Sequence, residues 1–243
     1  MNIVFTMAGK YNRFRLFGNK VPKYLLPLGS GTVLSNVIEV MKYNADNANF
    51  YFVANRDDQL FHPILKSILK RFKIPLSSLL YIDDTASQLQ SAMMAMELLS
   101  EEEKDSPICF ANIDTIVKNR KIFFQKLAEC KENESLLDTF HGNSPSYSYI
   151  RTNDHHGVSH VLDKKVVSSF ACSGLYGFGS YRKMADKAKD VLKINSAANF
   201  TELYNTFIEK SQRVDFLNSD DPNDTIVLGV PEEYLINIHR FGQ

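Results

Sequence analysis

Near its start the chain reads Asn2-Ile3-Val4-Phe5-Thr6-Met7-Ala8-Gly9, a short apolar run that stops at a glycine. We predict a strand over Asn2–Met7. The next apolar residues lie on one helical face of Val33–Tyr43, and Phe50–Ala54 predicts a second strand. A strand, a helix and a second strand in this order indicate the α/β class.

The same alternation continues to residue 111. Helices are expected over Gln59–Phe72 and Ser87–Leu99, and strands over Leu79–Ile82 and Ile108–Ala111. Because strands and helices take turns along the chain, we expect a mostly parallel sheet with helices on both faces.

After Glu134 the pattern changes. Ser146–Thr152 and Val158–Leu162 predict an antiparallel pair around the polar turn Asn153–Gly157. The later elements are expected at Leu175–Phe178, Val214–Leu217 and Ile226–Leu228 as strands, and at Tyr181–Leu192, Thr201–Lys210 and from Pro231 as helices. We therefore expect one domain, 1–243, with a parallel half over about 1–133 and a small antiparallel section within about 134–243.

Composition excludes several classes of protein. Lys+Arg and Asp+Glu are equal at 28 each, so the chain lacks the basic excess of a general nucleic-acid binder. The cysteines Cys109, Cys130 and Cys172 are too far apart for a zinc or redox motif. We find neither a signal-peptide pattern nor an apolar stretch near the roughly 20 residues of a membrane span. A cytoplasmic protein that binds neither membrane nor nucleic acid is expected.

The loop after the first strand carries the first chemical signal. Gly9 lets backbone N–H groups approach a phosphate closely. The cations that follow are Lys10, Arg13, Arg15, Lys20 and Lys23. Arginine grips phosphate with a planar fork, and lysine supplies a point charge. This loop suits a polyphosphate, while the alternative is a solvated basic loop between two core elements.

Two runs in this region, Met7–Phe14 and Val21–Leu28, resemble the signature of the sugar-phosphate nucleotidyltransferase family, roughly A-G-x-G-[ST]-R-[FLM] and then P-K-x-L-[LIV]-P. The resemblance implies a Rossmann-like sheet and a nucleotide held by Met7, Ala8 and Gly9. It gives Arg13 and Lys23 the catalytic role of binding the triphosphate and stabilising the reacting phosphorus. Tyr11 replaces the family's second glycine, so either the loop takes a different path or Tyr11 covers the nucleotide and binds it.

Two further turns resemble family segments. Asp83–Ser91 is similar to T-x-G-x-x-x-T, which implies that Thr85 and Gln88 read the ribose and base. The amide of Gln88 suits a pyrimidine edge, while the alternative is simple N-capping of the next helix by Thr85 or Ser87. Asn112-Ile113-Asp114 resembles the family's G-D-[TSH], which implies nucleotide contact at Asn112 and a Mg²⁺ ligand at Asp114; a turn or cap role for Asp114 is the alternative.

The second half resembles the family's acceptor side. Asp163-Lys164 is similar to an E-K pair whose lysine contacts the acceptor's phosphate, and the resemblance adds Tyr176, Glu202 and Asn205 as acceptor-binding residues. Glu202 is also placed to form a capping box with Asn199.

The closing motif presents a conflict. Gly229–Glu233 matches G-T-P-E-[DE], but Val227 stands where the family has a second metal-binding Asp, which leaves Asp224 as the nearest candidate. His155, His156 and His160 lie on the predicted hairpin, where a solvated turn is favoured over a metal site.

Taken together, the resemblance implies a nucleotidyltransferase that couples a nucleoside triphosphate, with CTP favoured, to a small phosphorylated metabolite and releases pyrophosphate. The expected cofactor is Mg²⁺. The acceptor is a phosphosugar, or a phosphate such as phosphocholine or phosphoglutamine, and the expected pathway is bacterial capsule or surface-polysaccharide synthesis. Two alternatives stay open: a nucleotide-sugar glycosyltransferase, since Asn112-Ile113-Asp114 partly matches D-x-D, and a non-catalytic nucleotide-binding protein, given Tyr11 and Val227. Nothing in the sequence indicates the oligomeric state.

Overall fold

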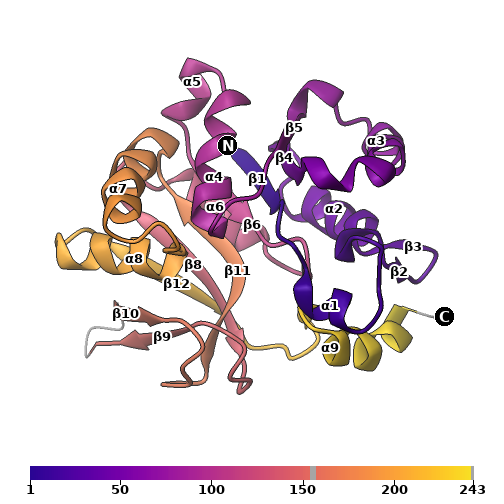
Figure 1. The fold of residues 1–243 in the computed structure, drawn as a ribbon. Helices are drawn as coiled ribbons and strands as arrows, with labels where there is room; N and C mark the ends of the chain where they lie inside the picture. Colours follow the sequence, from indigo (N-terminus) through magenta and orange to yellow (C-terminus); the bar gives the residue numbers. More distant parts are fainter. Residues whose placement is uncertain (154–156, 242–243) are drawn as a thin grey trace.

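A parallel core occupies the first half of the chain, as the sequence predicts. The computed structural model describes residues 1–153 and 157–241. Within it, β1 (Asn2–Met7) lies between β4 (Asn49–Asn55) and β6 (Ile108–Ala111), and β5 (Leu79–Ile82) follows β4, all four parallel. Figure 1 shows these strands side by side. The α/β prediction is confirmed.

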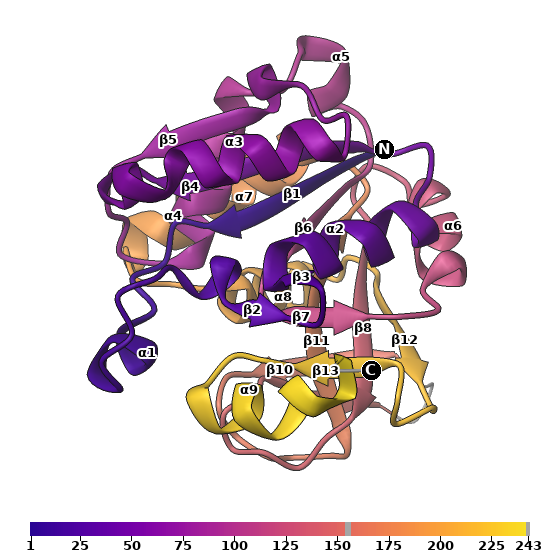
Figure 2. The same cartoon turned by 90° about the vertical axis from the view of Figure 1, so that its right-hand side faces the viewer.

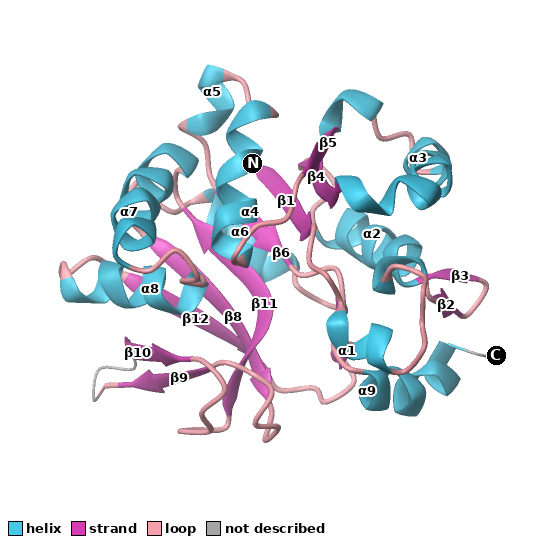
Figure 3. Cartoon of the chain, viewed as in Figure 1, coloured by secondary structure: helices cyan, strands magenta, loops and turns pink. Residues whose placement is uncertain are grey.

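The sheet continues into the second half by reversing direction. β11 (Phe170–Phe178) pairs antiparallel with β6 and with β8 (Ser135–His141), and β12 (Val214–Ser219) runs parallel to β8. β9 (Tyr149–Thr152) and β10 (Val158–Leu162) form the expected hairpin at one end. In the described part of the chain this makes one sheet of nine strands (Figure 3). His155, His156 and most of the turn Asn153–Gly157 lie outside the described residues.

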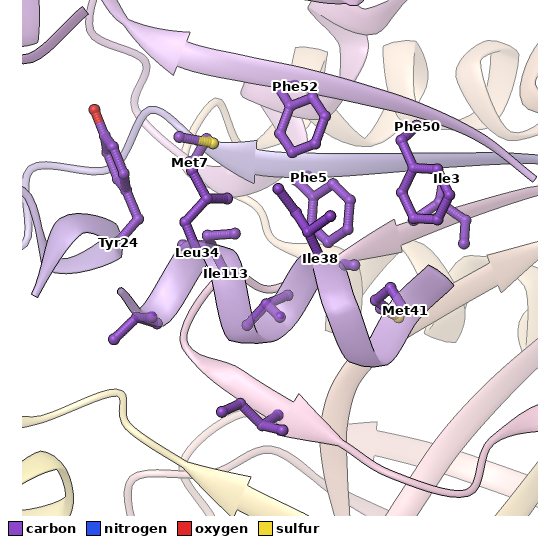
Figure 4. Close-up of a cluster of buried hydrophobic side chains, with 14 of the residues drawn as sticks. Ile3, Phe5, Met7, Tyr24, Leu34, Ile38, Met41, Phe50, Phe52 and Ile113 are labelled. Atoms are coloured by element: carbon purple, nitrogen blue, oxygen red, sulfur yellow. The ribbon is translucent and has the colours of Figure 1, made fainter. Parts of the chain in front are cut away.

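Helices cover both faces of the sheet because β1 buries alternate side chains on opposite faces. Ile3 and Phe5 pack with α2 (Val33–Asn44), whose apolar face includes Leu34 and Ile38 (Figure 4). α3 (His62–Arg71) and α6 (Lys121–Ala128) belong to the same cluster. Val4 packs on the other face, where the helices are α4 (Gln88–Met93), α7 (Tyr181–Ile194) and α8 (Phe200–Glu209).

Short elements connect these layers. They are α1 (Asn12–Leu16), η1 (Lys23–Leu25), β2 (Pro27–Leu28), β3 (Gly31–Thr32), η2 (Arg56–Phe61), η3 (Leu76–Ser78), η4 (Met94–Glu97), α5 (Glu101–Lys104), β7 (Thr115–Val117), β13 (Thr225–Val227), α9 (Pro231–Asn237) and η5 (Ile238–Phe241). β7 pairs with β13, and Phe14 of α1 contacts Tyr234 of α9 edge-on, so α9 lies next to the first loop, as Figure 1 shows. Figure 2 shows α9 at the bottom of the molecule, below β7.

Two predicted helices are shorter than expected. The single helix expected over Ser87–Leu99 divides into α4 and the 3₁₀ turn η4. The helix expected from Gln59 begins at His62, because Arg56–Phe61 forms the 3₁₀ turn η2 and Pro63 lacks the N–H that would bond back to Gln59. Among the described residues, no helix combines the length and apolarity needed to cross a membrane.

Candidate active site

Two adjoining pockets lie at the carboxyl ends of β1 and β6, where α/β sheets bind ligands. The first, of about 360 Å³, is lined by the loop after β1 and by the start of α4; we call it the loop pocket. The second, of about 270 Å³, is lined by the antiparallel part of the sheet and by the β13–α9 turn; we call it the sheet pocket. Gln88, Asn112 and Asp114 line both, so one wall separates two chambers.

The loop pocket gathers most of the predicted nucleotide-side residues. Its lining includes Met7, Ala8, Gly9, Tyr11, Lys23, Thr85, Gln88, Asn112 and Asp114. These residues come from four separate segments of the sequence, and the parallel order of β1 and β6 brings them together. Arg13 lines the sheet pocket instead, with Lys164 and Tyr176.

An ion pair stands at the junction of the two pockets. Lys23 Nζ donates to Asp114 Oδ2, although the two residues are 91 positions apart. The side chains are 24% and 13% exposed, so each keeps a face toward the pocket. The backbone of Asp114 is fixed as well, because its carbonyl accepts from the Leu228 N–H at 2.7 Å. This fixed pair offers a cation and an anion side by side where the chambers meet.

Tyr11 resolves the conflict at the second glycine position. Its backbone is left-handed, with φ 39° and ψ 42°, which is the region that glycine enters without strain. The loop therefore keeps a glycine-like turn, at a cost of about 1–2 kcal/mol for a residue with a Cβ. The tyrosine hydroxyl donates to Asp58, and burial together with this hydrogen bond raises the pKa of Tyr11 to about 12.

A second charged group fixes the same loop. Lys10 Nζ lies 2.6 Å from Asp84, and Asn55 Nδ2 donates to Asp84 and to the Ala8 carbonyl, both at 2.9 Å. The Lys10 ammonium, with the Asn55 amide, holds the pKa of Asp84 below its usual range. The Lys10 ammonium is thus paired with Asp84, and Lys10 is not among the residues that line the loop pocket.

The wall between the pockets is a hydrogen-bonded unit. Gln88 Nε2 donates to Thr6 Oγ1 and to Asn112 Oδ1, each at 2.7 Å. Asn112 in turn lies against Gly174, whose φ is +94° and whose carbonyl accepts from the Asn112 backbone N–H at 2.9 Å. Because both amide protons of Gln88 are used, its carbonyl oxygen is the group left for a ligand.

The helix-capping alternative at α4 holds for Ser87 rather than for Thr85. Ser87 accepts from the Gln90 N–H, whereas Thr85 bonds the Ser91 hydroxyl at 2.6 Å and the Ser87 carbonyl. Thr85 nevertheless lines the loop pocket, so a structural role and a binding role are compatible there.

The sheet pocket combines cations, carboxylates and aromatic rings. Lys164 pairs with Asp163 at 2.8 Å, and Asp163 also accepts from Ser148 Oγ at 2.9 Å. Tyr176 stacks on Phe200 with ring centroids 4.5 Å apart, and burial raises the pKa of its hydroxyl well above the ordinary value. This mixture suits a polar, phosphorylated ligand with hydroxyl or amino groups.

Two residues that line the sheet pocket, Tyr147 and Glu233, are bonded to each other. Tyr147 of the β8–β9 loop donates to Glu233 of α9 at 2.7 Å, and Glu233 also accepts from the N–H groups of Gly229 and Val230. Sequence reasoning did not pair Tyr147 with Glu233, since the two residues lie 86 positions apart. Cys172 also lines this pocket, and burial raises the pKa of its thiol to about 12, which excludes a thiolate nucleophile at neutral pH.

Three predicted site residues lie away from both pocket linings. Glu202 forms the capping box with Asn199, accepting its N–H at 2.9 Å. Asn205 bonds both backbone groups of Val161 and so fixes β10 to α8. Asp224 accepts from Asn119 at 2.8 Å and is not brought to Asp114.

The donor set fits a magnesium ion that takes few protein ligands. Within residues 1–153 and 157–241, no group of three or more His, Cys, Asp or Glu side chains is arranged to hold a metal. Val227, where the resembling motif has a second Asp, lines the sheet pocket with an apolar side chain. Asp114 supplies a carboxylate at the junction, and Mg²⁺ commonly completes its shell with phosphates and water.

Comparison with known proteins places the fold. No family model and no curated protein matches the chain. A nucleoside-diphosphate-sugar pyrophosphorylase from Vibrio cholerae RC9 superposes with a TM-score of 0.82 at 20% identity, over 98% of this chain and 99% of that one. The two chains therefore share one fold over nearly their whole length.

Two further structures agree. A Bacillus anthracis protein described as a glucose-1-phosphate thymidylyltransferase, in complex with sucrose, has a TM-score of 0.81 at 12% identity, over 99% of this chain and 94% of that one. A UDP-glucose pyrophosphorylase complexed with UDP-glucose has a TM-score of 0.75 at 14% identity, over 99% and 97%. At these identities the likeness establishes a Rossmann-like α/β fold, and the activities named belong to those proteins.

Proposed function

We propose that the protein is a nucleotidyltransferase, which joins the α-phosphate of a nucleoside triphosphate to a phosphorylated small metabolite and releases pyrophosphate. One observation carries this proposal: two pockets share the wall of Gln88, Asn112 and Asp114, and both are supplied with cations. A group transfer between two bound molecules needs two such chambers with the reacting atoms at their junction.

The reaction requires that the two substrates be positioned and that the developing negative charge be stabilised, and it does not require a general base. A phosphate monoester has a second pKa of about 6, so its oxygen is already an anionic nucleophile at neutral pH. That oxygen attacks the α-phosphorus, the bond to the β-phosphate oxygen breaks, and pyrophosphate leaves with the electron pair. Lys23 and Arg13 flank the junction and stabilise the charge that develops, and Lys164 holds the acceptor's phosphate.

A magnesium ion is part of the proposal. Asp114 would hold it together with phosphate oxygens, and the ion would neutralise charge on the triphosphate. Lys23 shares the Asp114 carboxylate, so it keeps that carboxylate oriented toward the junction. Asp224 is not needed for this arrangement.

The base preference is proposed from Gln88. Its two amide protons are donated within the protein, so the carbonyl oxygen remains to accept from a ligand. Cytosine offers an exocyclic amine where uracil offers an oxygen, which favours CTP over UTP. For the acceptor, the carboxylates Asp163 and Glu233 beside Lys164 suit a phosphate ester that also carries hydroxyl or ammonium groups, as phosphosugars and phosphocholine do. A role in surface-polysaccharide synthesis is consistent with such acceptors.

Pyrophosphate release tests the proposal. The protein is mixed with Mg²⁺, each of the four ribonucleoside triphosphates and dTTP, and a panel of sugar 1-phosphates, phosphocholine and phosphoglutamine. We expect release that depends on both substrates and is greatest with CTP. Sugar transfer from a nucleotide sugar without pyrophosphate release would instead identify a glycosyltransferase, and nucleotide binding without any turnover would identify a sensor.

A further inference from the structure

A buried carboxyl group behind the loop pocket has no part in the chemistry proposed above. Asp58 lies in η2, directly after β4, and is only 4% exposed. Burial of such a group is costly unless its oxygens are hydrogen-bonded. Both oxygens are engaged: Tyr11 donates to Oδ1, and Tyr24 donates to Oδ2 at 3.2 Å.

The two tyrosines stand at the two ends of the cationic loop. Tyr11 precedes Arg13 by two residues, and Tyr24 directly follows Lys23. Tyr24 is 1% exposed, and Figure 4 shows its hydroxyl directed away from α2 and the apolar cluster. One carboxyl group therefore receives a hydrogen bond from each end of the segment that holds both proposed catalytic cations.

The Tyr11 end of this contact is reinforced from within the loop. The Arg15 guanidinium lies 4.8 Å from the centre of the Tyr11 ring and donates to its hydroxyl at 3.4 Å. The left-handed backbone at Tyr11 needs such support, because a side chain in this region persists only when its surroundings hold it there. A glycine would adopt the same turn without strain but would supply no hydroxyl to hold the loop.

We propose that Asp58 is a positioning residue that holds the segment from Tyr11 to Tyr24 in the shape that binds the triphosphate. It acts through the two tyrosines, since Asp58 itself lines neither pocket. The consequence for nucleotide binding rests on the proposed function, whereas the restraint on the loop does not. Tyr11, at the position of the motif's second glycine, is thus hydrogen-bonded to Asp58, which follows the end of β4.

Limited trypsin digestion tests the restraint without any assumption about activity. The loop contains Arg13, Arg15 and Lys20 as cleavage sites. Asp58→Asn keeps the side-chain size but removes the charge that accepts the two hydroxyl bonds. Loss of one charge-assisted hydrogen bond corresponds to about a tenfold change in the population of an open loop, so we expect cleavage here to become about tenfold faster. Asp57→Asn is the matched control, because Asp57 is an exposed neighbour on the same turn, and it should be cleaved like the wild type.

Steady-state kinetics test the consequence. In Asp58→Asn the KM for CTP should rise about tenfold, because binding must then order the loop, while the acceptor KM stays within about twofold. Tyr11→Phe should act in the same direction, and the double variant should be no worse than the more affected single variant, as expected for two partners in one contact. If the substitution only lowered the stability of the protein, the KM for CTP and the KM for the acceptor would either both change or both stay the same.

Two results overturn the inference. One is loop cleavage in Asp58→Asn and Tyr11→Phe at the wild-type rate; the other is faster cleavage with an unchanged KM for CTP. If Asp58→Asn fails to fold, Tyr11→Phe decides both measurements. If the wild-type protein releases no pyrophosphate with any substrate, the proposed function fails, and the cleavage rates still decide whether Asp58 restrains the loop.

Discussion

Replacing Gly174 by alanine should damage the wall between the two pockets. A Cβ at this position would lie 2.5 Å from Asn112 Nδ2 and 2.6 Å from its Cγ, closer than real contacts allow. The backbone is also at φ +94°, which side chains with a Cβ rarely adopt. Asn112 must therefore move, and it takes with it the acceptor of one Gln88 hydrogen bond.

The expected cost has two parts. The backbone strain contributes about 1–2 kcal/mol, as for other residues forced into a positive φ. The overlap with Asn112 adds about 1–3 kcal/mol, as is typical when atoms are forced into a packed site. We therefore expect a loss of about 2–5 kcal/mol in the free energy of unfolding. The displaced Gln88 should also raise the KM for the nucleotide about tenfold.

The variant Gly18→Ala distinguishes the cost of backbone strain from the cost of the overlap with Asn112. Gly18 has a similar φ of +79°, but a Cβ there meets nothing within 4 Å. Urea unfolding is followed by circular dichroism and tyrosine fluorescence, since the chain has no tryptophan. Gly18→Ala should lose only the strain term. Equal midpoints for the two variants, with an unchanged nucleotide KM in Gly174→Ala, would refute the assignment of Asn112 as a fixed wall.

The remaining predictions concern the proposed chemistry. Lys23→Ala should lower turnover by about 10²-fold, because a charge partner of the transition state is lost, and circular dichroism should show an intact fold; near wild-type turnover would remove Lys23 from the mechanism. Activity should disappear with EDTA and return with Mg²⁺ or Mn²⁺, and Asp114→Asn should lose most of it, since an amide is a poor ligand for a hard cation; full activity in chelator would contradict the metal assignment. Lys164→Ala should raise the acceptor KM about tenfold or more, while calorimetry shows unchanged CTP binding. Lys165→Ala, at an exposed neighbour, is the control. Equal acceptor KM values for the two variants would show that Lys164 does not bind the acceptor.

Two departures from the predicted strands share a physical cause. β8 was missed because Asp138 interrupts its apolar run, and the structure shows this carboxylate buried against Arg120, whose Nε donates at 2.8 Å. β11 proved longer than expected, since its first half contains Ser173, a polar residue that is buried where its side chain bonds Asp138 of β8. A buried ion pair or a covered polar strand depends on partners distant in the sequence, so local patterns cannot reveal it.

The sequence by itself determined the parallel core and singled out the first loop, which lines the loop pocket. Alternation of apolar runs defined β1, β4, β5 and β6 within a residue or two, because these strands are mostly apolar, and β1 and β6 are buried along their whole length. The glycine and cations of the first loop indicated a phosphate site, because these residue types offer backbone approach and positive charge wherever the loop lies.

Only the tertiary structure decided which side chains are available to a ligand. Glu202 and Asn205 resembled acceptor-binding residues, yet their hydrogen bonds are made to Asn199 and Val161. Asp58 matched no motif, and its role comes from Tyr11, 47 residues away; likewise Tyr147 contacts Glu233, 86 residues away. A motif contains only the residue types and their order along the chain. A binding site depends on which polar atoms are left without a hydrogen bond inside the folded protein, and that is decided by the tertiary structure.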